Sequence, residues 1–136
     1  MDYKPKIEEF FRKQSDPRSA INDLEKNKHP ELPPYDSPAD FFLLLLRERA
    51  FWQWHTTAAS ALQGLCIEPM SPEIYEELCR FSVEALAFDA DILSRSIRAI
   101  GSTKEGRAFL ARKAVDWIVL GLDEWAQEAQ HCVNRD

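Results

Sequence analysis

Residues 72–100 read PEIYEELCRFSVEALAFDADILSRSIRAI, and the spacing of their apolar side chains decides the fold class. These side chains recur at alternating steps of four and three residues, and they are Ile74, Leu78, Phe81, Ala85, Phe88 and Ile92. Such spacing places them along one side of an α-helix. The pair Ser71 and Pro72 is typical of a helix start, because proline at the first helical position loses no hydrogen bond. We therefore predict a long helix over about 72–100.

Residues 103–133 repeat this spacing and predict another long helix. Ser102 and Glu105 are spaced as in a capping box at its start. The apolar side chains of this helix form one predicted seam: Ala111, Val115, Ile118, Leu122, Trp125, Ala129 and Cys132. Gly121 interrupts the segment at a cost of about 1 kcal/mol relative to alanine. Either a neighbouring helix approaches closely at Gly121, which is the interpretation we favour, or the helix kinks there.

A third long helix is predicted over about 38–63, and its apolar residues follow a different pattern. The run Phe41–Leu46 is apolar in every direction around the helix axis, which is typical of a helix that is central or covered by another chain. Trp52 and Trp54 lie about 200° apart on a helix, so they cannot both face one core. Either the helix is covered on both sides, or one aromatic side chain stays near the surface.

The remaining segments complete an all-α fold. The predicted parts are an N-terminal helical hairpin at 1–27, with helices at about 5–15 and 17–27, a proline-rich connector at 28–37, and a main bundle at 38–136. No strand-like alternation bounded by turn residues competes with this interpretation. We predict a single helical domain, 1–136, with about five helices.

The composition of the chain excludes several classes of protein. The 136 residues carry a formal net charge of −6 and include three cysteines. An acidic chain lacks the basic face that nucleic acids and anionic membranes attract, so neither is expected as a partner. The longest apolar run is far shorter than the roughly 20 residues that span a bilayer. An odd number of cysteines disfavours a disulfide framework, and the expected location is the cytoplasm.

Candidate chemistry in the sequence is sparse. Glu128 and His131 have the Glu-x-x-His spacing of di-iron bundles, but the chain has no second copy of this motif. The only cysteine-rich zinc candidates lack paired spacing, and they are Cys66, Cys79, His131 and Cys132. Asp89 and Asp91 lie two residues apart, so they do not face each other on a helix. We expect no metal, no cofactor and no catalytic residues, and therefore no enzyme.

The charge distribution and the surplus apolar surface favour a protein-binding function. Residues 71–101 hold six acidic and three basic residues, so half of the net charge lies there. Acidic residues at a helix start suit the helix dipole, and they also offer a face to a basic partner. The predicted partner-binding residues are Phe42, Trp52, Trp54, Glu73, Glu76, Glu77 and Glu84. The predicted function is a protein–protein interaction module, an inhibitor or adaptor that occludes a partner surface.

An alternative function is the binding of an apolar small ligand within the bundle. Aromatic side chains would line its pocket, and they are Phe51, Trp52, Trp54, Trp117 and Trp125. A deep cavity beside these side chains would favour the ligand, whereas an exposed Phe42, Trp52 or Trp54 would favour the protein partner.

The expected length of the helices also predicts a homodimer. Unbroken helices over 72–100 and 103–133 would each exceed about 40 Å, longer than the roughly 37 Å diameter of a compact chain of this size. A second copy is the commonest cover for overhanging apolar surface. The rival explanation is a break near Asp89–Asp91 or at Gly121.

Overall fold

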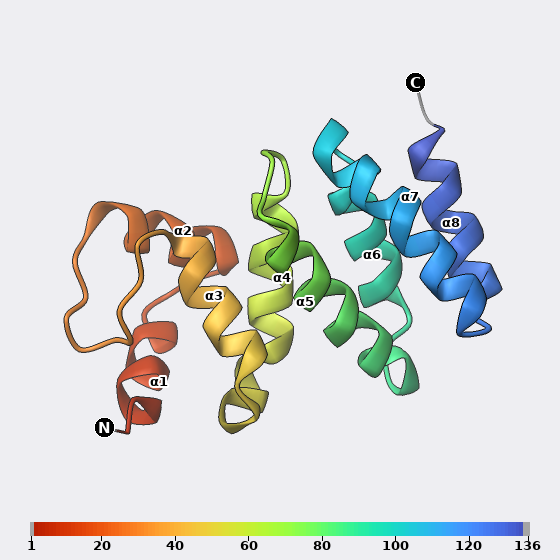
Figure 1. Cartoon of the computed structure of the whole chain (residues 1–136). Coiled ribbons are helices and arrows are strands. Elements are labelled where there is room, and N and C mark those ends of the chain that lie inside the picture. The colour runs from red at the N-terminus through yellow and green to blue at the C-terminus, as the bar shows by residue number, and fades with distance from the viewer. Residues whose placement is uncertain (1, 135–136) are drawn as a thin grey trace. The chain divides into compact units, whose positions relative to one another are not determined.

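The computed structural model describes residues 2–134, and these residues form helices, turns and loops without a strand (Figure 1). The all-α class is therefore confirmed. The predicted number of about five helices is wrong, because the described residues form eight α-helices and two short 3-10 helices. They are α1 (Lys4–Arg12), α2 (Pro17–Lys26), α3 (Pro38–Arg47), η1 (Arg49–Trp54), α4 (His55–Leu65), α5 (Pro72–Glu84), η2 (Ala85–Ala87), α6 (Asp91–Ile100), α7 (Lys104–Val119) and α8 (Asp123–Val133).

The chain divides into two compact units, unit 1 (Met1–Leu62) and unit 2 (Gln63–Asp136). The boundary falls inside α4, so neither unit coincides with the predicted hairpin or with the predicted main bundle. The single domain over 1–136 stays a prediction.

Helix starts follow the predicted chemistry closely. Asp16 caps α2 by accepting a hydrogen bond from the Ser19 N–H at 2.7 Å. At α3, the Asp40 carboxylate accepts the N–H of Ser37 at 3.1 Å. The start of α7 differs from the prediction by one residue. Thr103 rather than Ser102 is its cap, and the Thr103 hydroxyl accepts the Gly106 N–H at 3.1 Å.

Each of the three long predicted helices is interrupted. The 38–63 helix breaks at Glu48, whose backbone is extended (φ −90°, ψ 119°), and a 3-10 turn follows with a kink at Phe51. This turn points Trp54 inward, where it stacks on Phe11 with ring centroids 6.2 Å apart, while Trp52 stays exposed. The structure therefore matches the second alternative for this pair, an aromatic side chain near the surface.

The predicted 72–100 helix also breaks, close to Asp89. Helix α5 tightens into η2, and α6 starts at Asp91, whose N–H donates to the Asp89 carboxylate at 3.0 Å. Phe88 leaves the predicted seam and is exposed. Since the break lies at the proposed position, the unbroken length that motivated the homodimer is absent here.

The predicted 103–133 helix ends early at Gly121. This glycine has φ +79°, a conformation that side chains rarely adopt, and a Cβ there would meet nothing within 4 Å. The preferred interpretation, a close helix approach at Gly121, is therefore wrong, and the glycine separates α7 from α8. The close approach occurs instead at Gly106, where a Cβ would overlap the Ile100 carbonyl.

The core of unit 1 is built around α3. Six of its residues are buried: Ala39, Phe41, Phe42, Leu43, Leu45 and Leu46. Phe41 contacts the ring of Phe10 at 5.7 Å and that of Tyr35 at 6.0 Å. The Tyr35 hydroxyl donates to the Leu24 carbonyl at 3.1 Å, which ties the proline-rich connector to α2.

Unit 2 contains a buried polar network between α5 and α6. The Gln63 amide donates to the Ser96 hydroxyl at 2.9 Å. The Ser96 and Ser82 hydroxyl oxygens lie 2.8 Å apart, and Ser82 donates to the Leu78 carbonyl at 2.6 Å. Because the Ser82 proton is used there, Ser96 donates to Ser82. Helices α7 and α8 lie side by side in this unit, and α6 packs against both (Figure 1).

Candidate functional site

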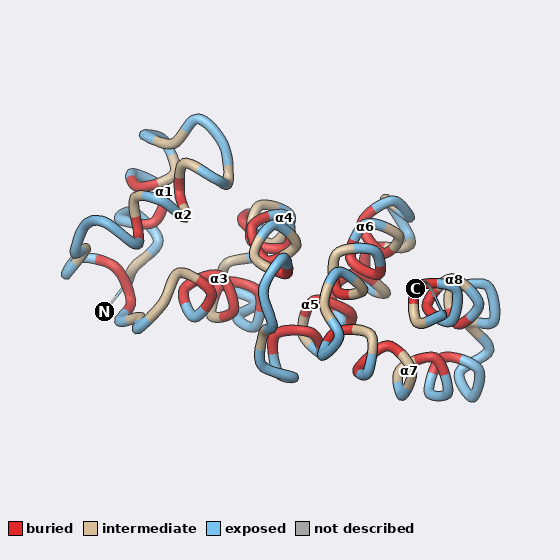
Figure 2. The backbone as a smooth tube through the Cα atoms, turned by 90° about the horizontal axis from the view of Figure 1, so that it is seen from above, coloured by how far each residue is buried: buried red, intermediate tan, exposed pale blue. Residues whose placement is uncertain are grey.

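Helix α7 is apolar on two opposite sides. Its inner side packs into unit 2 and consists of Gly106, Phe109, Leu110, Ala114 and Trp117. Residues 115, 118 and 119 lie on the other side of the same helix, because each residue turns the helix by about 100°. The tube view accordingly shows buried and exposed turns alternating along α7 (Figure 2).

We define the outer face of α7 by Val115, Ile118 and Val119. Their exposed fractions are 57%, 54% and 81%, and Leu120, just past the helix end, is 71% exposed. Four large apolar side chains within six residues are therefore open to solvent, whereas isolated exposed apolar residues are ordinary on a monomer surface. The predicted seam of Ala111, Val115, Ile118 and Leu122 belongs to this outer side, and its members Val115 and Ile118 are exposed.

A groove continues the outer face toward α8. Its volume is about 480 Å³, and its lining is Ile118, Asp123, Ala126, Gln127 and Gln130. Ile118 thus belongs both to the outer face and to the groove wall. The lining combines aliphatic surface with amide groups and a single carboxylate, a composition that fits a protein segment better than a reactive substrate.

The charged residues near the outer face are acidic, except for Arg112 and Lys113 at its start. Residues 114–134 contain no lysine or arginine, but they contain Asp116, Asp123, Glu124 and Glu128. The last turn of α7 has no basic residue either. Helix carbonyl ends carry partial negative charge, and a basic side chain usually compensates it. The end of α7 therefore presents apolar surface with a net negative border.

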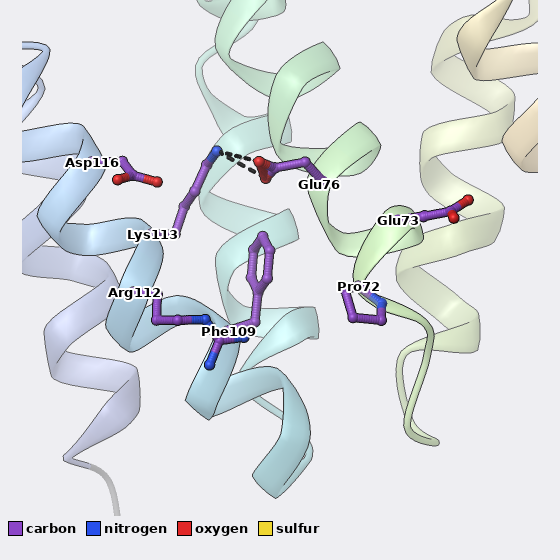
Figure 3. Close-up of a pocket in the computed structure, with 7 residues that line it drawn as sticks. All are labelled: Pro72, Glu73, Glu76, Phe109, Arg112, Lys113 and Asp116. Carbon is purple, nitrogen blue, oxygen red and sulfur yellow. Dashed lines mark hydrogen bonds and ion pairs between the residues drawn. The ribbon is translucent and has the colours of Figure 1, made fainter.

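A second surface hollow lies between α5 and α7 (Figure 3). Its volume is about 530 Å³, and it is lined by Pro72, Glu73, Glu76, Phe109, Arg112, Lys113 and Asp116. The Lys113 ammonium donates to both oxygens of the Glu76 carboxylate at 3.0 and 2.8 Å, and this pair spans the hollow. A cation and an anion that neutralise each other leave little net charge here for a ligand.

Farther along α5 a related hollow of about 340 Å³ contains the other predicted glutamates, Glu77 and Glu84. Both bind Arg80, whose guanidinium donates to Glu77 at 2.8 Å and to Glu84 at 2.9 Å. Burial would lower the pKa of Arg80, but the two carboxylates outweigh it and raise that pKa. The floor of this hollow includes Trp117, Leu120 and Leu122, so it reaches the end of α7.

The structure separates the predicted partner-binding residues into three groups. Phe42 and Trp54 are buried, so they belong to the core rather than to a surface. Trp52 is exposed on η1 of unit 1. The glutamates line the two hollows of α5: Glu73 and Glu76 the first, and Glu76, Glu77 and Glu84 the second.

The aromatic pocket required for a small apolar ligand has no counterpart in either unit's described hollows. Phe51, Trp52 and Trp54 belong to unit 1, whereas Trp117 and Trp125 belong to unit 2. Trp117 is buried and forms part of an open hollow instead of an enclosed one.

The cysteine, histidine and carboxylate residues considered above as metal ligands form no metal site among the described residues, and the three cysteines are buried. Among residues 2–134, no three His, Cys, Asp or Glu side chains are placed to hold a metal ion. Burial raises the pKa of both Cys66 and Cys79 to about 12, so these thiols stay protonated and poorly nucleophilic near neutral pH. Glu128 is engaged elsewhere, because Ser94 donates to its carboxylate at 2.6 Å.

One polar cluster in unit 1 was not predicted. The His29 ring lies 3.1 Å from the Asp23 carboxylate and 3.1 Å from that of Glu31, and it contacts the Phe10 ring edge-on at 5.2 Å. Burial raises the pKa of Asp23, but hydrogen bonds from Asn27, Gln14 and His29 outweigh it, and the pKa is lowered. These contacts tie the connector to α1 and α2, which is a structural role.

Among residues 2–134, no helix is both long and apolar enough to cross a bilayer. No protein-family model matches this chain, and neither a curated protein nor a solved structure shows significant similarity to it. The geometry of the chain itself must therefore carry any functional proposal.

Proposed function

We propose that this chain is a non-enzymatic protein–protein interaction module, an inhibitor or adaptor that acts by covering part of a partner surface. The observation that carries the proposal is the outer face of α7, where Val115, Ile118 and Val119 are exposed side by side. Burying such side chains stabilises a complex by the hydrophobic effect, at about 25 cal/mol per Å² of apolar surface. A folded unit gains nothing from leaving them in water.

Two further observations support a protein as the ligand. The outer face is convex helix surface next to a shallow groove, whereas small-molecule sites are usually concave and enclose most of the ligand. Among the described residues, no three His, Cys, Asp or Glu side chains are placed to hold a metal ion, and burial shifts the thiols of Cys66 and Cys79 toward lower reactivity. Both features favour binding over catalysis.

The cytoplasm is the compartment we propose for this activity. Cys66, Cys79 and Cys132 are all buried and none is paired in a disulfide. Buried thiols that form no disulfide are typical of proteins in a reducing compartment.

The homodimer predicted from the sequence remains a separate proposal. Its original reason was the length of unbroken helices, and the helices end at Glu84, Ile100, Val119 and Val133 instead. Several exposed apolar side chains are open to a second copy, among them Trp52, Phe88 and those of the outer face of α7. Light scattering across a range of concentrations tests it, and a mass that stays at one chain would reject it.

Affinity capture with two matched variants tests the proposed function. Val115→Ser/Val119→Ser removes apolar surface from the outer face, and Phe88→Ser removes a comparably exposed side chain elsewhere in unit 2. We expect a protein from the producing cells to be retained by the native chain and by Phe88→Ser, and to be lost with the double variant. Identical capture by all three proteins would contradict the proposal.

A further inference from the structure

We propose that the outer face of α7 and its groove bind a basic amphipathic helix of a partner protein. This inference rests on the proposed function and adds the chemistry of the partner. Its basis is the combination of an aliphatic face with a border of net negative charge: Arg112 and Lys113 lie at its start, and residues 114–134 hold four acidic and no basic side chains.

The shape of the site favours a helical ligand. Val115, Ile118 and Val119 lie on one side of α7 at the spacing that matches the ridges of a second helix. The adjoining groove runs along α8 from Asp123 to Gln130. Because the described residues include no strand, a partner has no sheet edge to extend, and helix-in-groove packing is the recognition mode that fits.

The charges select the sign of the ligand. Asp123 lines the groove beside Ile118, and the groove lining contains no lysine or arginine. Asp116 lies on the α5 side of α7, where Arg112 and Lys113 line the same hollow (Figure 3). After Lys113, no lysine or arginine follows until residue 135. A partner with lysine or arginine beside its apolar stripe would therefore meet the Asp123 carboxylate without a competing cation in the groove.

The same charges disfavour a second copy of this chain as the occupant. In a twofold-symmetric contact each copy presents the same residues to the other. Two faces with the same net negative border would then approach each other, and like charges repel. A foreign basic helix avoids this repulsion.

Peptide binding tests the proposal directly. The probes are fluorescently labelled peptides of about 18 residues, or five helical turns, with leucine along one side and lysine and arginine on the flanks. One control carries glutamate at each basic position, and another has the same composition in scrambled order. Fluorescence anisotropy then measures binding to the full chain at low and high salt.

Three results are expected. The basic amphipathic peptide binds, whereas the acidic and scrambled peptides bind at least about tenfold more weakly. Val115→Ser/Val119→Ser weakens binding about tenfold or more, since apolar contacts at the centre of an interface dominate affinity. Asp123→Asn weakens it several-fold and reduces its salt dependence, because screening acts on charge pairs.

Matched controls separate these effects from damage to the fold. Phe88→Ser and Glu68→Gln alter exposed side chains outside the site, and both should bind the basic peptide as the native chain does. Circular dichroism melting shows whether each variant is folded.

Several outcomes would overturn the proposal. They are the absence of binding by the basic peptide, equal binding of the acidic or scrambled peptide, and unchanged binding by the Val115→Ser/Val119→Ser variant. Self-association that this variant abolishes would identify a second copy as the occupant. If affinity capture still finds a partner that depends on Val115 and Val119, the partner chemistry is wrong but the proposed function stands.

Discussion

Helices α3 and α7 are both apolar on more than one side, but they differ in how this surface is covered. In α3 the side chains from Phe41 to Leu46 are buried in nearly every direction, as its all-round apolar pattern predicts. In α7 only the side that contains Leu110 and Trp117 is buried, and Val115 and Val119 are open to solvent. The apolar surface of α3 is therefore covered within its own unit, whereas the outer face of α7 is open to solvent.

Truncation of one side chain on each helix gives the largest contrast. We expect Phe42→Ala to destabilise the chain by about 4 kcal/mol, because it opens a cavity at a fully buried position. Val119→Ala should change the free energy of unfolding by less than about 0.5 kcal/mol, as exposed substitutions do. Urea denaturation measures both. Comparable losses for the two variants would show that the outer face of α7 is already covered.

Substitution of Gly106 tests how closely the inner side of α7 packs against the end of α6 at Ile100. A Cβ there would overlap the Ile100 carbonyl, so Gly106→Ala should cost about 3 kcal/mol. Gly64→Ala is the matched control, because Gly64 is helical and a Cβ there meets nothing within 4 Å. This control should stabilise the chain by about 0.5 to 1 kcal/mol. Thermal melting compares the two, and equal melting temperatures would contradict the close contact.

Substitution of Gly121 tests the break that ends the outer face. Its φ of +79° is unfavourable for alanine, so Gly121→Ala should cost about 1 kcal/mol without any steric clash. Gly121→Asn is the informative companion, since asparagine tolerates this conformation better than alanine and should lose less. A stabilising effect of alanine would mean that α7 and α8 join into the continuous helix predicted from the sequence.

A smaller effect on stability is expected from the polar cluster of Asp23, His29 and Glu31, which packs against Phe10 in unit 1. The backbone N–H of Glu31 and, to a smaller extent, the His29 ring lower the pKa of the Glu31 carboxyl. Burial raises the pKa of Asp23, but its hydrogen bonds outweigh burial and lower that pKa. A carboxyl whose pKa is lowered by folding adds stability above its unfolded pKa, and this contribution is lost as the pH falls through the folded pKa. The contribution should therefore be present at neutral pH and disappear below about pH 4.

NMR titration of the side-chain carboxyl carbons measures this effect. In His29→Ala the pKa values of Asp23 and Glu31 should both rise toward their ordinary values of 3.8 and 4.5. Unchanged titration of Asp23 and Glu31 would show that His29 does not act on them.

Local signals predicted helix starts well and helix interruptions poorly. Asp16 and Ser37 precede prolines, and both helices start at those prolines because the local chemistry alone determines the cap. The breaks at Glu48 and Asp89 carry no glycine or proline. They depend on tertiary packing, for example the stacking of Trp54 on Phe11, which no local pattern contains.

None of the residues of the outer face or its groove was among the predicted partner-binding residues, and the reason lies in α7. The steps 111, 115 and 118 and the steps 110, 114 and 117 are both apolar, so periodicity shows two apolar sides without showing which one is buried. The glutamates of α5 line two hollows, as described above. The pairing of Glu76 with Lys113 was not predicted, because Lys113 lies 37 residues from Glu76 in the sequence.

The location of the buried thiols makes the two units separately observable. Cys66, Cys79 and Cys132 all lie in unit 2, and the chain has no other cysteine. A thiol reagent therefore modifies the chain only when unit 2 opens, and each reaction rate reports the frequency of an opening event. Mass spectrometry of the modified peptides would resolve the α4–α5 turn, α5 and α8 from one another. Tryptophan fluorescence reports on both units together, because Trp52 and Trp54 lie in unit 1 and Trp117 and Trp125 in unit 2. Comparing its change with the thiol reaction rates shows whether unit 2 opens together with the rest of the chain.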